Sequence, residues 1–293
     1  MIRRESRGWL FVAPALVHLV LFALLPVAYA FWISLHNWDI LAGTRPFAGL
    51  GVYQSLMQDA SFWQSLRQTA LYALIAVPLG MAVALLVAVA VAKPLRGMAL
   101  FRTIFYIPAV SSGVAISMLW ITMYLPDSGF FNVMLKGLGG TSIDWLNDPK
   151  WALSALAFMS VWVGLGPRMI IYVAGLLNLP STVYEAASLD GASPGRQFWR
   201  ITMPLLAPTH LFVLVTATIG AFQTFTPVYM MTQGRPLGTT DLVGFHIYEE
   251  AWRKFNVSDA AAQSFVLLVV LALLSWFQFR LMRRQLEGYD AGH

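Results

Sequence analysis

Few side chains in this sequence could carry out covalent chemistry. Cysteine is absent from the 293 residues, which excludes disulfides, thiol catalysis and cysteine-ligated metals on this chain. The longest uncharged runs also lack Asp and Glu, so the paired carboxylates that an intramembrane enzyme needs are missing there. No metal-ligand spacing occurs among the five histidines, His18, His36, His210, His246 and His293. The sequence therefore predicts a protein that is not an enzyme and holds no metal.

The elements that position the remaining polar groups are expected to be membrane helices. Hydrophobic residues make up 58% of the chain and charged residues 11%, whereas a soluble domain carries about 25% charged residues. The apolar runs are long enough for helical spans, and they do not alternate as the strands of a membrane barrel would. We predict an all-α polytopic protein that forms one domain over residues 1–293. Its six spans are expected at about 9–36, 67–92, 103–125, 151–177, 207–231 and 260–280.

The basic residues predict the orientation of these spans. With six spans both termini share a side, and that side carries eleven Lys and Arg residues against five acids. The opposite side carries seven against nine. Because cytoplasmic loops are enriched in Lys and Arg, both termini are expected in the cytoplasm. The net charge of +5 then reflects topology, and no nucleic-acid partner is expected.

The cytoplasmic segment at about 179–206 has the clearest local signals in the chain. Thr182 and Glu185 have the spacing of a capping box, which predicts the start of a short helix. Gly191 suits the left-handed position that follows a helix end. Ser193–Pro194 is typical of the start of a second short helix, which Pro204 is expected to end.

Two helices of about two turns each are not stable alone in water, so something must hold them. One interpretation is an amphipathic loop on the bilayer surface, with Phe198 and Trp199 in the interface. The other is a docking element for a cytoplasmic protein, in which Ala186, Ala187 and Ala192 form a flat surface. The physical signals leave both open.

The stretch Glu185–Ala192, followed by Ile201 and Pro204, resembles the EAA loop of the membrane subunits of binding-protein-dependent ABC importers. That pattern is EAA, three residues, Gly, nine residues, Ile, any residue and Leu-Pro, and this chain departs from it only at Met203. Similarity to the carbohydrate-uptake branch, the maltose and glycerol-phosphate type permeases, extends over nearly the whole chain. It includes Phe11–Ala15, Leu25–Pro26, Phe47–Leu50 and Thr232–Pro236.

This resemblance implies a permease subunit of a sugar importer in a bacterial or archaeal inner membrane. Such a subunit works with a second permease subunit, two ATPase subunits and an extracytoplasmic sugar-binding protein. ATP and Mg²⁺ are expected on the ATPase, because this chain has no GxxxxGK[ST] phosphate loop and needs no cofactor of its own. The coupling positions carried over from the family are Glu185, Ala186, Ala187, Asp190, Gly191, Ala192, Ile201 and Pro204.

The substrate path implied by the resemblance lies in the fourth and fifth spans. Sugar-contacting positions of the maltose-type permeases correspond here to Ser160, Val163, Gly164, Gly220, Ala221 and Thr224. Several are small here, so the site is expected to be wider, built mainly by the partner subunit, or shaped for another glycan. Hydroxyl and amide groups suited to a sugar occur at Gln223, Thr224, Thr226 and Tyr229. For each of these, an ordinary hydrogen bond between helices is the alternative.

Arg168 is the one formal charge inside a predicted span, and a charge there normally faces a partner or a cavity. A role toward an anionic substrate group is one interpretation. Snorkelling or a salt bridge is favoured, because Arg168 lies about two helical turns on the cytoplasmic side of Ser160. Pro167 leaves the carbonyl of Val163 without its helical partner, and that group could face the path.

A self-sufficient secondary transporter is the alternative function. Such transporters usually show an internal repeat and ionisable groups at the membrane midplane. No convincing repeat is found in this sequence, and the coupling loop would have no role. The two hypotheses differ in one respect that can be measured, because only a secondary transporter would work as the reconstituted chain alone.

Overall fold

The computed structural model describes residues 2–40, 42–92 and 97–290, and the side chains of residues 11–282 within those ranges. These residues are almost all helical and form no strand; only two isolated bridges pair His36 with Phe47 and Asp39 with Thr44. The predicted all-α fold is therefore confirmed. Lys93 and Arg96, which contributed to the predicted orientation, lie outside the described residues.

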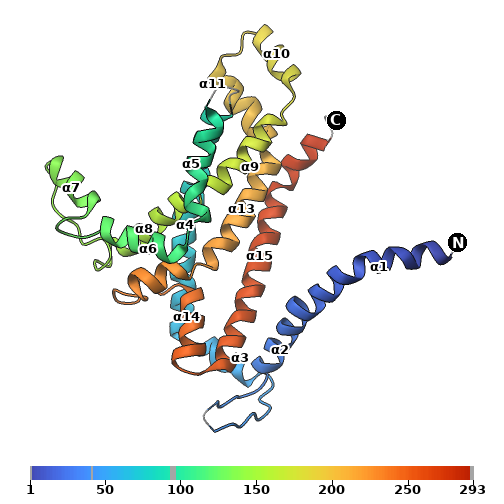
Figure 1. Ribbon diagram of the computed structural model, residues 1–293, viewed down its shortest axis with the longest axis vertical. Coiled ribbons are helices and arrows are strands. Elements are labelled where there is room, and N and C mark those ends of the chain that lie inside the picture. Colours follow the sequence, from blue (N-terminus) through green and yellow to red (C-terminus); the bar gives the residue numbers. More distant parts are fainter. Residues whose placement is uncertain (1, 41, 93–96, 291–293) are drawn as a thin grey trace. The chain divides into compact units, whose positions relative to one another are not determined.

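The helices follow one another along the whole chain (Figure 1). The first are α1 (Ile2–Leu19), the π-helical turn η1 (Val20–Leu24), α2 (Leu25–Ser34), α3 (Gly51–Gln58), α4 (Ala60–Val91), α5 (Met98–Val110), α6 (Gly113–Met123) and α7 (Phe130–Gly137). Next come α8 (Ala152–Val163), α9 (Leu165–Leu177), α10 (Ser181–Leu189), α11 (Pro194–Gln197), the π-helical turn η2 (Phe198–Thr202), α12 (Met203–Leu205) and α13 (Ala207–Phe222). The last are the π-helical turn η3 (Val228–Thr232), α14 (Val243–Tyr248), the π-helical turn η4 (Glu249–Arg253) and α15 (Val257–Asp290).

Three helical segments are long and apolar enough to cross a membrane unbroken, and they are Phe11–Ser34, Ala60–Val91 and Val257–Met282. Three more candidates are bent pairs. The bend is 97° between α5 and α6, 49° between α8 and α9, and 65° between Pro194–Leu205 and α13. Six spans result if each pair counts as one, which agrees with the predicted number.

The fifth predicted span, 207–231, is shorter in the structure. Helix α13 ends at Phe222, and helical structure resumes at Thr226, which leads into η3. Gln223 and Thr224, which were expected on a helix, therefore lie in the non-helical connection at 223–225, whereas Thr226 and Tyr229 are helical.

The chain forms two compact units, and the prediction of a single domain stays a prediction. The first unit combines the chain up to Phe62 with His246–Val269. Within it, the amide of Trp38 donates to Ser258 Oγ at 2.9 Å, and the rings of Phe31 and Phe265 meet edge to face with centroids 5.2 Å apart. These contacts tie the start of α15 to the N-terminal segment.

The second unit combines Trp63–Phe245 with the chain from Val270 onward. One of its cores joins α4, α9 and α13 through Ala84, Leu85, Ala88, Val91, Leu165, Met169, Tyr172, Val173, Leu206 and Val213. Another joins α6 and α8 through Ile116, Trp120, Tyr124, Ala155 and Met159. Both cores belong to elements that surround the same cavity, so packing here fixes the geometry of that cavity.

Two glycines on α9 allow neighbouring helices to approach closely, as small residues commonly do in membrane bundles. A Cβ at Gly166 would meet the backbone of Phe105 and Tyr106 on α5, with the Tyr106 Cα at 2.6 Å. A Cβ at Gly175 would lie 2.5 Å from Thr209 Oγ1 on α13. The absence of side chains at these positions keeps α9 in contact with both neighbours.

Candidate functional site

A cavity of about 420 Å³ lies within the second unit, between α4, α5, α6, α8, α9 and α13. Six of the nine predicted path residues line it, and they are Ser160, Val163, Gly164, Gly220, Ala221 and Thr224. Its other walls are Tyr72, Ala76, Val77, Pro108, Ala109, Ser111, Gly113, Ile116, Met159, Arg168 and Pro227. Residues that are 60 positions apart in sequence thus share one hollow, as a path through the fourth and fifth spans requires.

A short chain of hydroxyl groups runs along the cavity wall. Tyr72 Oη donates a hydrogen bond to Ser160 Oγ at 2.5 Å, and Thr224 Oγ1 lies 3.5 Å from Tyr72 Oη. Thr224 Oγ1 also donates to the carbonyl of Gly220 at 3.2 Å. Tyr72 comes from the second span and was not predicted. The signal available in the sequence was a single phenol within a run of apolar residues.

The other three predicted path residues do not line the cavity. Gln223, Thr226 and Tyr229 follow the end of α13, and the Tyr229 ring stacks on Phe225 with centroids 5.4 Å apart. The prediction placed them within the span 207–231, as polar groups near the path. In the structure a non-helical connection at 223–225 separates Thr226 and Tyr229 from α13.

Arg168 faces the cavity from α9, and its guanidinium rests on two glycines. A Cβ at Gly80 would collide with Arg168 Nη1, and a Cβ at Gly164 would lie 2.8 Å from Arg168 Cζ. Because Gly164 precedes Arg168 by four residues, the side chain points back along the helix, away from the 179–206 loop. The favoured interpretation of a snorkelling side chain is therefore wrong.

The alternative form of that interpretation, a salt bridge, is not formed within the described part of this chain. Arg168 takes part in none of the ion pairs found among the described residues, and its buried Nη1 has no hydrogen-bond partner among them. The chain has a helical break close to Pro167, because α8 ends at Val163 and α9 begins at Leu165; the sequence predicted only an unpaired Val163 carbonyl there. Both Val163 and Gly164 at the break line the cavity.

The 179–206 loop forms the two short helices expected, with a change in how the first one begins. Helix α10 starts at Ser181 with Pro180 as its N-cap residue and no side-chain cap, so the predicted Thr182–Glu185 capping box is wrong. Pro180 is extended, with a φ of −68° and a ψ of 123°, and Thr182 already lies inside the first turn.

The end of α10 follows the prediction. Gly191 is left-handed, with a φ of +75°. The Gly191 amide donates to the Ser188 carbonyl at 3.1 Å, and the Ala192 amide donates to the Ala187 carbonyl at 2.9 Å. These two bonds form the Schellman arrangement, which satisfies carbonyls that a helix end otherwise leaves unpaired. Backbone hydrogen bonds therefore terminate the helix that carries the EAA residues.

The second helix of the loop is longer than predicted. Ser193 and Pro194 begin it as expected, but it continues through η2 and α12 and bends only at Leu206, so Pro204 does not end it. Pro204 lies inside this continuous helical run, directly after the π-helical turn η2. The loop thus passes into α13 across a single 65° bend.

Side-chain contacts hold the two loop helices together. Gln197 Nε2 donates to Ser188 Oγ at 3.0 Å and to the Ala192 carbonyl at 3.1 Å. The hydroxyls of Tyr184 and Thr202 lie 2.8 Å apart. Sequence reasoning singled out none of these side chains, because no local spacing relates them.

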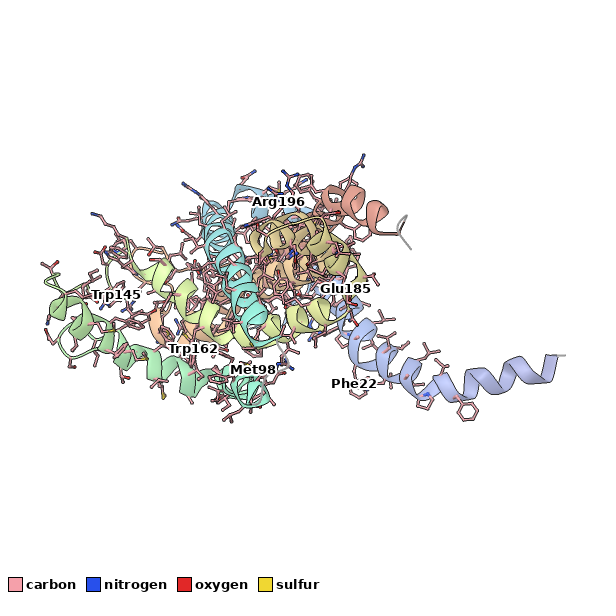
Figure 2. All side chains as sticks on the ribbon, turned by 90° about the horizontal axis from the view of Figure 1, so that it is seen from above. Phe22, Met98, Trp145, Trp162, Glu185 and Arg196 are labelled. Atoms are coloured by element: carbon pink, nitrogen blue, oxygen red, sulfur yellow. The ribbon has the colours of Figure 1, made fainter. Side chains whose placement is uncertain are left out.

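Phe198 packs against the core formed by α4, α9 and α13, whereas Trp199 is 67% exposed. The interpretation that placed both rings in the lipid interface is therefore wrong for Phe198, which anchors the loop to the protein. In Figure 1, α10 and α11 lie at one end of the helices α5, α9 and α13. Figure 2 looks onto that end, with Glu185 and Arg196 labelled on the loop helices.

A shallow hollow separates the two loop helices. Its lining residues are Ala187, Asp190, Ala192, Arg196, Gln197, Arg200 and Ile201. Four predicted coupling residues are among them, while Glu185, Ala186, Gly191 and Pro204 are exposed beside it. Leu189, at 90% exposure, presents an uncovered apolar side chain on the same helix. The loop therefore presents an exposed, partly apolar surface on helices that are held in place by hydrogen bonds and packing.

Comparison with known proteins agrees with this architecture. Residues 76–286 match the family described as "Binding-protein-dependent transport system inner membrane component". The chain is 36% identical to the lactose transport system permease protein LacF of Rhizobium radiobacter, over 96% of this chain and 95% of that protein. It is 32% identical to the sn-glycerol-3-phosphate transport system permease protein UgpA of Agrobacterium fabrum, over 95% of each.

A solved structure has the same fold. The bacterial alginate ABC transporter in complex with an alginate pentasaccharide-bound periplasmic protein contains a chain that matches with a TM-score of 0.81 and 22% identity. The match covers 97% of this chain and 96% of that one. Family match, relatives and fold lead to one conclusion: this chain belongs to the inner membrane components of binding-protein-dependent transport systems, as a permease of an ABC importer.

Proposed function

We propose that this permease carries sugars, and that they pass through the cavity beside Ser160, Gly220 and Thr224. The observation that carries the proposal is that the six path residues carried over from the family resemblance all line that one cavity. Its hydroxyl chain offers the donors and acceptors that sugar recognition needs. Relatives named for lactose and glycerol-phosphate transport support the same substrate class.

The proposed assembly has this chain beside a second permease subunit, with two ATPase subunits and an extracytoplasmic sugar-binding protein. ATP and Mg²⁺ belong to the ATPase, and this chain binds no cofactor. Both termini face the cytoplasm of a bacterial or archaeal cell, and the chain spans its inner membrane. Membership in a binding-protein-dependent family contradicts the alternative of a self-sufficient secondary transporter.

The loop between α10 and α12 is the proposed docking surface for the ATPase. Closure of the ATPase dimer would move α10, and the continuous path through η2 and α12 would carry that motion to α13, which lines the cavity. Firm attachment of the loop supports this role, because Gln197 and Phe198 tie it to its own helices and to the core.

Copurification tests the assembly. The tagged chain, extracted from native membranes in mild detergent, is expected to bring down a second permease and an ATPase. Recovery of the chain alone in a transport-competent form would contradict the proposal. In the reconstituted complex, Glu185→Lys is expected to uncouple ATP hydrolysis from uptake while sugar still binds the binding protein; unchanged uptake would argue against docking at this loop.

A second experiment tests the cavity. Gly220→Trp introduces a large ring where an added Cβ meets nothing within 4 Å, so the variant should fold and fill the cavity. We expect ATP-driven uptake of radiolabelled sugar to fall at least tenfold. Gly137→Trp is the matched control, because Gly137 also has open space but does not line the cavity. Equal uptake by the two variants would place the path elsewhere.

A further inference from the structure

The cavity carries one unbalanced positive charge. Arg168 is its only lining residue with a formal charge, since none of the residues that line it is Asp, Glu or Lys. Within the described part of the chain, Arg168 Nη1 is buried and has no hydrogen-bond partner. A buried guanidinium nitrogen is unfavourable unless it has a hydrogen-bond partner or a counter-charge nearby. The arrangement therefore lacks an anion.

The guanidinium is held toward the cavity by its surroundings. Gly80 on α4 and Gly164 at the break before α9 leave a space that the planar group fills, and a methyl group at either position would collide with it. The helical break lets Val163 and Gly164 open the wall beside it. The side chain of Arg168 is thus half-buried, with Nη1 packed against Gly80, and it lines the cavity.

The other polar groups of the cavity suit an uncharged part of the same ligand. Tyr72, Ser160 and Thr224 form a chain of hydroxyls, and hydroxyls both donate and accept. A guanidinium only donates, and its planar fork fits two oxygens of one carboxylate or phosphate. The cavity therefore combines one site for an anionic group with another for sugar hydroxyls.

We infer that the cavity selects acidic sugars, with Arg168 binding the carboxylate or phosphate group of the substrate. The inference rests on the proposed sugar path and adds a charge requirement to it. A carboxylate from the second permease subunit could pair with the same nitrogen. Such a pair would neutralise the cavity, which gives a different experimental result.

The first test measures the charge of the cavity. The chain has no native cysteine, so Gly220→Cys places a single thiol in the cavity without a clash. In the assembled importer, we expect a negatively charged methanethiosulfonate to react faster than a positively charged one. Adding Arg168→Gln should reduce that ratio by on the order of tenfold, because one nearby charge is lost.

Lys136→Gln is the control, since it removes one exposed positive charge that does not line the cavity. It is expected to leave the ratio unchanged. Arg168→Lys keeps the charge and should retain most of the ratio. A ratio that Arg168→Gln does not alter would overturn the inference, because the guanidinium would then be neutralised by a partner or inaccessible.

The second test uses three matched sugars as protectants of the same thiol. Galacturonate offers a carboxylate, galactose 6-phosphate offers a phosphate, and galactose offers neither. Protection by one or both acids that exceeds protection by galactose, and that Arg168→Gln abolishes, supports the inference and tells which anion is bound. Equal protection by galactose would overturn the inference and leave the sugar path standing. Failure of all three sugars to protect would contradict both.

Discussion

Replacing Gly166 by alanine should separate α9 from α5, although the change adds only one methyl group. Its Cβ would lie 2.6 Å from the Cα of Tyr106 and 3.0 Å from the carbonyl carbon of Phe105. Ordinary contacts of this kind are about 3.5–4.0 Å. The obstructing atoms belong to the backbone, so no side-chain rotation can relieve the collision. The two helices must move apart by roughly 1 Å.

Overpacking of this kind costs about 1–3 kcal/mol. Alanine is favoured over glycine inside a helix by about 0.5–1 kcal/mol, which offsets part of that cost. Gly220→Ala measures the helix-propensity gain without the collision, because Gly220 lies inside α13 and its added Cβ meets nothing within 4 Å. The same substitution should therefore destabilise the protein at position 166 and leave it unchanged or slightly stabilised at position 220.

Thermal unfolding followed by tryptophan fluorescence in one detergent compares the two variants. We expect the midpoint of Gly166→Ala to fall clearly below that of Gly220→Ala, with Gly166→Leu lower still. Because α5 and α9 both line the cavity, the rate of thiol labelling at position 220 should also change in the Gly166 variants. Identical midpoints for the two alanine variants would refute the close approach of α9 to the α5 backbone.

Three other perturbations have defined outcomes. Asn132 accepts a hydrogen bond from the Ile143 amide at 2.9 Å and donates to the carbonyls of Ile143 and Leu125 at 2.8 and 3.1 Å. Asn132→Leu should therefore lower the free energy of unfolding by about 2–4 kcal/mol, as measured by denaturant titration. Gln197→Ala removes two hydrogen bonds between the loop helices, so protease cleavage of the loop should quicken while the unfolding midpoint stays nearly constant. Burial raises the pKa of the Asp59 carboxyl, but hydrogen bonds from the Ser61 hydroxyl and amide and the Phe62 amide outweigh burial and lower it below its ordinary value of 3.8. Asp59 therefore stabilises the fold fully above that pH and loses its effect as the pH falls through the lower value, so Asp59→Asn should flatten the acid-unfolding curve.

Much of the fold could be predicted from sequence because lipid imposes a strong rule on composition. A long apolar run must become a helix, since no water is present to satisfy its backbone, and six candidate spans followed from this rule. Bends could not be predicted in the same way. The 97° turn between Val110 and Gly113 falls at Ser111 and Ser112, which with Gly113 mark a break in the run but do not give its angle.

Some features of the candidate site could be predicted because they depend only on the local backbone. Gly191 and the Ser193–Pro194 start followed from residue type, because each needs only its own neighbours. The positions of Tyr72 and Arg168 in the cavity wall depend on contacts between spans that are far apart in sequence. The hydrophobic periodicity of one helix does not indicate which other helix packs against it.

The packing of Arg168 against Gly80 and Gly164 also restricts the order in which this protein can change over evolutionary time. With arginine in place, alanine at Gly80 or Gly164 collides with the guanidinium. Once arginine is replaced by a short residue, alanine fills the space that the guanidinium leaves. The substitutions are therefore coupled, with non-additive effects on stability. A lineage that loses the charge can then lose the glycines, and those later changes would bar the arginine from returning.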